Sequence, residues 1–495
     1  MPFNFFRSSR AIRCWAALLT LGLLIQVDCR AQTAAPTATN PPAAQPPSTD
    51  PVLTLKPDHL DGVYALSEPA VWTVDVKSGD RSALGALTYA VKRDGGDDIA
   101  TGTINLASGP ATITATRPEP GALLAVVSVP NGTRHPRLWT GGALFAPDKI
   151  GPAAPAPADF DAFWKAKLQD LAAVPMNANV VQVSDADVPY NDGTPYYKVT
   201  LDNIWHTQVQ GQLACPVKKG KYPALIIFQA AGVGPLQKNM VVHPAKRGYL
   251  VLNIEAHDMP IDETPAFYNN LKATSLKDYT SIGVDDRDTY YFLRMVLGCV
   301  RAAEYLTSRP DWDGKTLIVS GVSQGGFQSF ATAALFPKVT AVVSDNTAGG
   351  DAYAAVAQPS RALSWPAMYF PPRPDDPDGS KTRTTLGYFD TIYFAGKVHC
   401  PALVCAGLID ETARPASVFS IYNAIPAANK ELLVFPFYDH ALAGSQLPYW
   451  HRLDDWTAAA KNGQPLPPQS TPAPDPNSIL ISGAIPPSNA ASSPH

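Results

Sequence analysis

The 495-residue sequence predicts a mixed α/β fold, with a β-sandwich near the N-terminus and a larger α/β domain after it. Two patterns support this prediction. Residues 53–150 contain short runs in which apolar and polar residues alternate between turn residues, as in antiparallel strands. Residues 151–462 contain continuous apolar runs that alternate with helical patterns, as in a parallel sheet covered on both faces.

The N-terminus carries the pattern of a secretory signal peptide. Three arginines precede the apolar segment 15–27, and small residues follow it. We predict a signal peptide over residues 1–31, with cleavage after Ala31, because the apolar segment is too short for a stable membrane span. Lipoprotein processing at Cys29 is the alternative, although Asp28 fits it poorly. The chain is therefore expected to be secreted or periplasmic.

Two segments are expected to lie outside the folded domains. Residues 32–52 are rich in alanine and proline, which predicts an extended linker. Residues 463–495 are rich in proline and serine, which predicts a disordered tail. Neither segment has the periodicity of a helix or a strand.

The first folded region, residues 53–150, is predicted to be an immunoglobulin-like β-sandwich. The length and spacing of its strands are typical of that architecture. No catalytic constellation is found in it. The expected strands are residues 71–76, 87–91, 101–106, 111–116 and 123–129.

A hinge rich in proline and alanine, residues 151–157, precedes the α/β domain. Asp159 is expected to cap a helix that docks onto this domain through Phe160, Phe163 and Trp164. Short strands and then buried ones are expected at 180–183, 196–201, 209–214, 224–228, 250–254, 316–319, 339–343, 402–406 and 432–435. An antiparallel start with a parallel continuation predicts the sheet of an α/β-hydrolase.

The most informative motif is Gly-Val-Ser-Gln-Gly-Gly at residues 321–326. A buried strand precedes it and a helical pattern follows it, so Ser323 is placed on the tight turn of a nucleophile elbow. Glycines on both sides leave room for that turn, and the helix directs free N–H groups toward the serine. A glycine-rich loop with an incidental serine is the alternative, but it leaves the second glycine pair unexplained. Ser323 is therefore the predicted nucleophile.

The partners of such a serine follow it in the order acid, then histidine. Asp410 follows one late strand and His440 follows the last strand, which predicts them as orienting acid and general base. Glu411 is adjacent, and a carboxylate of either length could orient an imidazole. Three other histidines of the α/β region precede the serine and have the wrong chain order: His206, His243 and His257.

The oxyanion that forms during acyl transfer needs backbone N–H donors. One is expected from Gln324, directly after the serine. The second is expected from the loop after strand 224–228, at Ala231 or Ala230. Later in the chain, residues 351–396 are longer than a simple crossover, and aromatic residues such as Trp365 and Tyr369 are expected either to cap the pocket or to pack an insertion.

Composition excludes some classes of function. The formal net charge of −4 gives no basic footprint, so nucleic acid is not an expected partner. The cysteines beyond the signal have no metal-binding spacing, so no metal is predicted. Buried thiols are expected at these positions, with one disulfide bridge left open: Cys215, Cys299, Cys400 and Cys405.

Three stretches of the sequence resemble the acetyl xylan esterase and cephalosporin C deacetylase family, carbohydrate esterase family 7. The first is 290–326, in which the glutamine after the serine is typical of the family. The second is 388–404, and the third is 407–423 together with the last strand and its histidine. The resemblance spans residues 155–455.

This resemblance implies Ser323 as nucleophile, His440 as base and Asp410 as acid. It implies removal of acetyl groups from an acetylated oligo- or polysaccharide, without a metal or another cofactor. It also points to a homo-oligomer, although the added N-terminal domain could change the assembly.

The chain departs from the family pattern at two places. Gln229-Ala230-Ala231 replaces His-Gly-Tyr in the oxyanion loop, so the backbone donor can remain while the tyrosine side chain is lost. Ala256-His257-Asp258 replaces Arg-Gly-Gln after the next strand, and His257 with Asp258 is expected to form a local polar pair.

Two other functions are compatible with parts of the sequence. An exported serine peptidase of the prolyl-oligopeptidase type is one, but such enzymes place a large propeller before the hydrolase, and residues 53–150 are too few to build one. The other is a non-catalytic carbohydrate-binding protein with a degenerate hydrolase domain. Covalent labelling of Ser323 would distinguish an enzyme from the latter.

Overall fold

The computed structural model describes residues 51–129, 137–188, 192–353, 361–370, 373–440 and 447–464. All of them belong to one compact unit. The predicted signal peptide and nearly all of the predicted linker and tail lie outside the described residues. No helix in the described ranges is long and apolar enough to cross a membrane.

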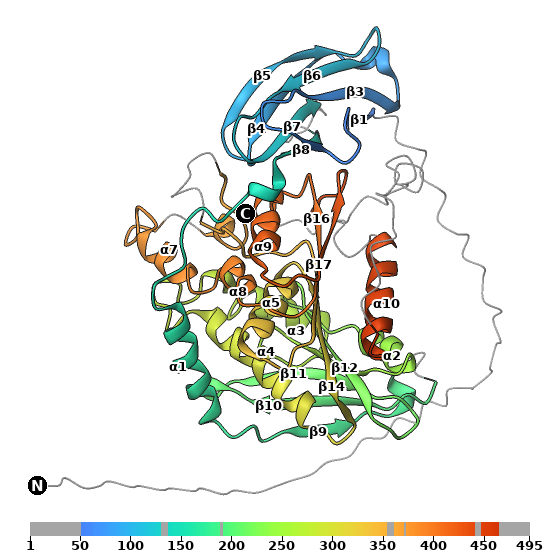
Figure 1. Cartoon of the computed structure of the whole chain (residues 1–495), viewed down its shortest axis with the longest axis vertical. Helices are drawn as coiled ribbons and strands as arrows, with labels where there is room; N and C mark the ends of the chain where they lie inside the picture. The colour runs from blue at the N-terminus through green and yellow to red at the C-terminus, as the bar shows by residue number, and fades with distance from the viewer. Residues whose placement is uncertain are drawn as a thin grey trace, which may run out of the picture. The chain divides into compact units, whose positions relative to one another are not determined.

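The described N-terminal residues form two β-sheets that face each other (Figure 1). The strand orders are β1-β3-β6 and β2-β8-β7-β4-β5. Trp72 is fully buried between the sheets, and its indole N–H donates to the carbonyl of Gly142 at 3.3 Å. The strands are β1 Val52–Pro57, β2 Val63–Tyr64, β3 Ala70–Ser78, β4 Ala86–Arg93, β5 Asp98–Asn105, β6 Ala111–Ala115, β7 Gly121–Val129 and β8 Arg137–Phe145.

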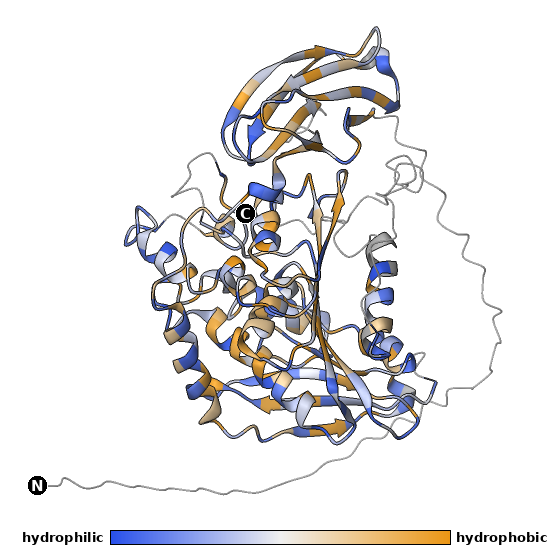
Figure 2. Ribbon diagram, in the orientation of Figure 1, coloured by the Kyte–Doolittle hydropathy of each residue, from blue (hydrophilic) through white to orange (hydrophobic). Residues whose placement is uncertain are grey.

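A nine-stranded sheet forms the centre of the α/β region, in the order β17-β16-β15-β14-β12-β13-β11-β10-β9. β9, β10 and β11 pair antiparallel, and β12 through β17 pair parallel, as the sequence predicts. Its central strands are apolar along most of their length (Figure 2). The strands are β9 Asn179–Gln182, β10 Tyr196–Asp202, β11 Gln208–Ala214, β12 Tyr222–Phe228, β13 Leu250–Ile254, β14 Trp312–Val322, β15 Ala341–Asp345, β16 Ala402–Gly407 and β17 Lys430–Phe435.

Helices cover both faces of this sheet, so that two separate apolar clusters form (Figure 1). The larger cluster lies under α4, α5 and α9, and the smaller lies under α2 and α10. Continuous apolar strands are stable only when both faces are covered in this way. The helices are α1 Phe160–Ala172, α2 Asn239–Lys246, α3 Pro265–Ala273, α4 Tyr291–Ser308, α5 Gln324–Leu335, α7 Ser380–Leu386, α8 Thr391–Ala395, α9 Pro415–Ala424 and α10 Leu447–Lys461.

The structure corrects the predicted role of Asp159. This residue lies at the N-terminus of α1, but its side chain accepts no hydrogen bond from the helix. Its carboxylate instead accepts hydrogen bonds from Tyr388 and from Arg287, at 2.7 Å from the latter. Asp159 therefore joins α1 to two distant segments. A local capping pattern cannot reveal such partners.

Candidate active site

Ser323 lies between β14 and α5 in a strained backbone conformation, with φ 58° and ψ −116°. The surrounding glycines make this turn possible. A Cβ atom at Gly321 would lie 2.4 Å from backbone atoms of Gly325, and one at Gly325 would lie 2.5 Å from the carbonyl oxygen of Phe228. Both distances are far below van der Waals contact. The geometry of the turn therefore requires glycine at positions 321 and 325.

The structure brings the three predicted side chains together. Ser323 Oγ lies 2.9 Å from Nε2 of His440, and Nδ1 of the same ring lies 2.7 Å from Oδ2 of Asp410. Since an ionised carboxylate can only accept, Nδ1 carries the proton in this pair, and the neutral Nε2 accepts from the serine hydroxyl. The residues are contributed by three elements of the sheet edge: the end of β14, the loop after β16 and the loop after β17.

The carboxylate of Asp410 is held by four donors. Oδ1 accepts the backbone N–H groups of Thr412 at 2.7 Å and Ala413 at 2.8 Å. Oδ2 accepts the side-chain amide of Asn346 at 3.0 Å, in addition to His440. The residue is only 2 % exposed, so these bonds replace the water that a buried carboxylate loses. The neighbouring Glu411 is exposed, which leaves Asp410 as the carboxylate at the histidine.

The two predicted oxyanion donors lie on adjacent elements. Gln324 is the first residue of α5 and is fully buried, whereas Ala231 is exposed in the loop after β12. The close approach of Gly325 to Phe228 places the start of α5 against the start of this loop. Within the described part of the chain, the backbone N–H groups of Gln324 and Ala231 donate to no other protein group.

A buried polar cluster lies behind residues 229–234, the loop that is expected to supply the second oxyanion donor. His257 contacts Tyr291 and Gly232, so the expected pair with Asp258 does not form. Asp258 instead accepts hydrogen bonds from Gln208 and Gln210. Tyr279, which the sequence did not single out, belongs to this cluster, because its ring packs edge-on against His257 with centroids 4.6 Å apart.

The segment expected to cap the pocket divides into buried and exposed aromatic residues. Trp365 is 2 % exposed and stacks on Phe292 with ring centroids 5.4 Å apart, so it packs in the core. Tyr369 is 57 % exposed. Of the two roles expected for these aromatic residues, Trp365 therefore has the second, because it packs the insertion and does not cap a pocket.

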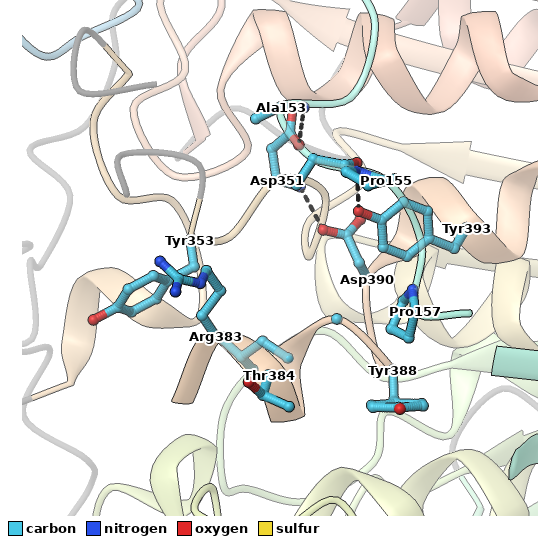
Figure 3. Close-up of a pocket in the computed structure, with 13 residues that line it drawn as sticks. Ala153, Pro155, Pro157, Asp351, Tyr353, Arg383, Thr384, Tyr388, Asp390 and Tyr393 are labelled. Carbon is cyan, nitrogen blue, oxygen red and sulfur yellow. Dashed lines mark hydrogen bonds between the residues drawn. The ribbon is translucent and has the colours of Figure 1, made fainter. Parts of the chain in front are cut away.

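A separate cavity of about 310 Å³ lies beside the proline-rich hinge and α7 (Figure 3). It is lined by tyrosines and charged residues, but their polar groups are largely engaged within the protein. Asp390 accepts the backbone N–H of Asp351 at 3.0 Å, and Tyr393 donates to the carbonyl of Ala154 at 2.7 Å. None of Ser323, Asp410 and His440 lines this cavity.

The four described cysteines, Cys215, Cys299, Cys400 and Cys405, are all free thiols. Three of them are buried, and Cys400 is partly exposed, so the expectation of thiols is confirmed. Among the described residues, no group of three or more histidine, cysteine or acidic side chains is placed to hold a metal ion.

The sheet topology, the strained serine and the hydrogen-bonded line of side chains define an α/β-hydrolase. Comparison with known proteins identifies the family. Residues 148–449 match the acetyl xylan esterase (AXE1) family, and the chain belongs to this family. It is accordingly a carboxylic ester hydrolase of carbohydrate acetyl esterase type.

Individual relatives agree with this assignment. The chain is 31 % identical over 396 residues to acetyl esterase Axe7A of Xylanibacter ruminicola, an alignment that covers 78 % of this chain and 85 % of the relative. Acetyl xylan esterase 1 of Thermoanaerobacterium sp. is 25 % identical with a TM-score of 0.51, covering 59 % of this chain and 92 % of the other. The acetyl xylan esterase of Paenibacillus sp. R4 shares the fold, with 22 % identity, a TM-score of 0.52, and coverage of 62 % and 96 %.

Proposed function

We propose that the chain removes acetyl groups from carbohydrates by two-step acyl transfer, with Ser323 as nucleophile, His440 as general base and Asp410 as orienting acid. The observation that carries this proposal is the unbroken line of hydrogen bonds from Asp410 Oδ2 through the imidazole to Ser323 Oγ, with distances of 2.7 and 2.9 Å. Both are ordinary hydrogen-bond distances, so the imidazole is oriented by Asp410 and is within reach of the serine proton that it must accept.

In the first step, Ser323 Oγ bonds to the acetyl carbonyl carbon while its proton passes to Nε2 of His440. The carbonyl oxygen takes up the electron pair and becomes an oxyanion. When the intermediate collapses, the bond to the sugar oxygen breaks and the imidazolium returns its proton to that oxygen. Water then attacks the acetyl-serine by the same sequence and releases acetate. Asp410 keeps the imidazole in the required tautomer throughout.

We assign the oxyanion to the backbone N–H groups of Gln324 and Ala231. Gln324 is favoured by its position at the N-terminus of α5, where N–H groups have no partner in the helix and the helix dipole favours negative charge. Ala231 is favoured by its exposure in the loop that the elbow contacts. Alanine side chains in this loop leave the acyl pocket wider than a tyrosine would.

The substrate class proposed is an acetylated oligo- or polysaccharide, by analogy with relatives named acetyl xylan esterase and acetyl esterase. A secreted or periplasmic location, an immunoglobulin-like identity for residues 53–150 and a homo-oligomeric state belong to the same proposal. The signal-like pattern at residues 1–31 supports the location, and the two-sheet sandwich supports the immunoglobulin-like identity. The family resemblance supports the homo-oligomer.

The decisive experiment compares the wild-type protein with Ser323→Ala. A fluorophosphonate probe is expected to label only the wild type, and acetate release from an aryl acetate and from acetylated xylan is expected to fall at least about 10³-fold in the variant. Equal labelling of the two proteins would refute the assignment of the nucleophile. Cleavage of proline p-nitroanilides but not of aryl acetates would instead favour a peptidase.

A further inference from the structure

The side chains of Gln229 and Val233 hold the two ends of the oxyanion loop, but its middle, residues 230–232, has no side chain long enough to hold it in place. Gln229, Ala230 and Ala231 stand where the resembled family has His-Gly-Tyr, and both alanines are exposed. Gly232 follows with φ 140°, a conformation that few other residues tolerate and that glycine alone does not fix. A loop that must present an N–H group within a few tenths of an ångström needs support from elsewhere.

His257 supplies one such support. Its Nε2 lies 3.0 Å from the carbonyl oxygen of Gly232, and its Nδ1 lies 2.7 Å from the hydroxyl of Tyr291. That hydroxyl accepts a hydrogen bond from Arg294 at 2.5 Å, so its single proton is free for Nδ1. Nδ1 is then the acceptor, Nε2 carries the ring proton, and the imidazole donates to the loop carbonyl. The direction of every bond in the line is thereby fixed.

Burial keeps this imidazole in the donating state. His257 is 1 % exposed, and burial together with the positive charge of Arg294 lowers its pKa to about 4. The ring therefore stays neutral over the pH range in which a serine esterase works. Both nitrogens of the His257 ring are engaged, Nδ1 with Tyr291 and Nε2 with the carbonyl of Gly232. His257 is therefore not a base for the serine.

Tyr279 supplies the second support, and it joins the two halves of the oxyanion site. Its hydroxyl donates to Oε1 of Gln324 at 2.7 Å. Its ring packs edge-on against His257, with centroids 4.6 Å apart, and His257 in turn donates to the carbonyl of Gly232. Through His257, Tyr279 thus connects the first residue of α5 with the loop after β12.

We infer that His257 and Tyr279 are positioning residues that set the oxyanion loop against the nucleophile elbow by holding its middle, where the residues themselves are small. The inference rests on the esterase function proposed above. Neither residue is assigned a contact with the substrate. Their effect is expected in the transition state, where the donors must meet the developing charge, and only weakly in the ground state.

The test uses Tyr279→Phe, His257→Leu and His257→Gln, with Tyr196→Phe as a matched control. Tyr196 also donates a buried hydroxyl to a glutamine Oε1, that of Gln212 at 2.8 Å, but under the other face of the sheet. With an aryl acetate, Tyr279→Phe and His257→Leu are expected to lower kcat about 10- to 100-fold and to change KM by less than about threefold. Affinity for an arylboronic acid, which forms a tetrahedral adduct on the serine, should fall by the same factor as kcat.

The controls separate positioning from folding and from the proposed function. The Tyr196→Phe variant should keep kcat within about twofold of wild type at a similar loss of thermal stability, and His257→Gln, which keeps a donor near Gly232, should recover most of the loss. Unchanged kcat and boronic acid affinity in Tyr279→Phe and His257→Leu would overturn the inference, and so would equal losses in Tyr196→Phe. Activity in Ser323→Ala would instead overturn the proposed function itself.

Discussion

Replacing Glu255 with glutamine should stabilise the folded protein, and the gain should grow with pH. Glu255 follows β13 and is 4 % exposed, and within the described residues neither carboxylate oxygen makes a hydrogen bond of ordinary geometry. Burial raises the pKa of its carboxyl from 4.5 to about 9. The folded state therefore keeps the proton at neutral pH, whereas the unfolded state loses it near its ordinary pKa.

The sign and the size of the effect follow from this difference. Between pH 4.5 and about pH 9 the folded state binds more protons than the unfolded state, so the free energy of unfolding falls as pH rises. Each pH unit above 4.5 removes about 1.4 kcal/mol, which amounts to about 3 kcal/mol at pH 7. An amide at this position has no proton to lose, so Glu255→Gln should lack this penalty.

Urea unfolding of wild type and Glu255→Gln at pH 5, 6, 7 and 8 measures the difference directly. The variant should gain less than about 1 kcal/mol at pH 5 and about 3 kcal/mol at pH 7. Glu431→Gln is the matched control, because Glu431 is also buried but is paired with Arg452 at 2.6 Å, so that variant should be less stable than wild type. A difference between Glu255→Gln and wild type that is constant, or that shrinks as pH rises, would refute the reasoning.

Three further predictions concern the site and its surroundings. In steady-state assays, Asp410→Asn should lower kcat about 10⁴-fold, because an amide at this position favours the wrong tautomer of the imidazole. Glu411→Gln should leave kcat within about twofold of wild type. Similar losses in the two variants would contradict the assignment of Asp410 as the partner of His440. Gly325→Ala should abolish fluorophosphonate labelling, because the new methyl group would lie 2.5 Å from the carbonyl oxygen of Phe228, and full labelling would show that the elbow tolerates a shift. The thiol of Cys405, whose pKa burial raises well above 9, should react with Ellman's reagent only after denaturation.

The sequence was sufficient to predict the three side chains that meet at the sheet edge. Ser323 directly follows β14, and Asp410 and His440 lie in the loops after β16 and β17; buried strands of this kind are recognisable from their continuous apolar runs. Because parallel strands end at the same edge, chain order alone then places the three residues together. Only the structure could decide between Asp410 and Glu411 as the partner of His440, because two adjacent carboxylates differ only in the side of the loop that they face.

Other parts could not be predicted because their partners are distant in the chain. Tyr279 lies in a short 3-10 turn with no periodic pattern, and it contacts Gln324 across 45 positions of sequence. Asp159 has the sequence of a helix cap, yet it bonds to Tyr388, 229 positions away. Strand β8 was missed because Gly141 and Gly142 interrupt its alternation of apolar and polar residues.

Gly142 of β8, together with Gly62, allows the N-terminal sheets to approach the hydrolase region closely. A Cβ atom at Gly142 would lie 2.4 Å from the carbonyl oxygen of Leu408, and one at Gly62 would lie 2.6 Å from the side chain of the same leucine. Leu408 begins the loop that carries Asp410. The N-terminal sheets therefore pack directly against the loop that carries Asp410. A hydrolase region that begins after residue 150 would lose the packing that holds this loop.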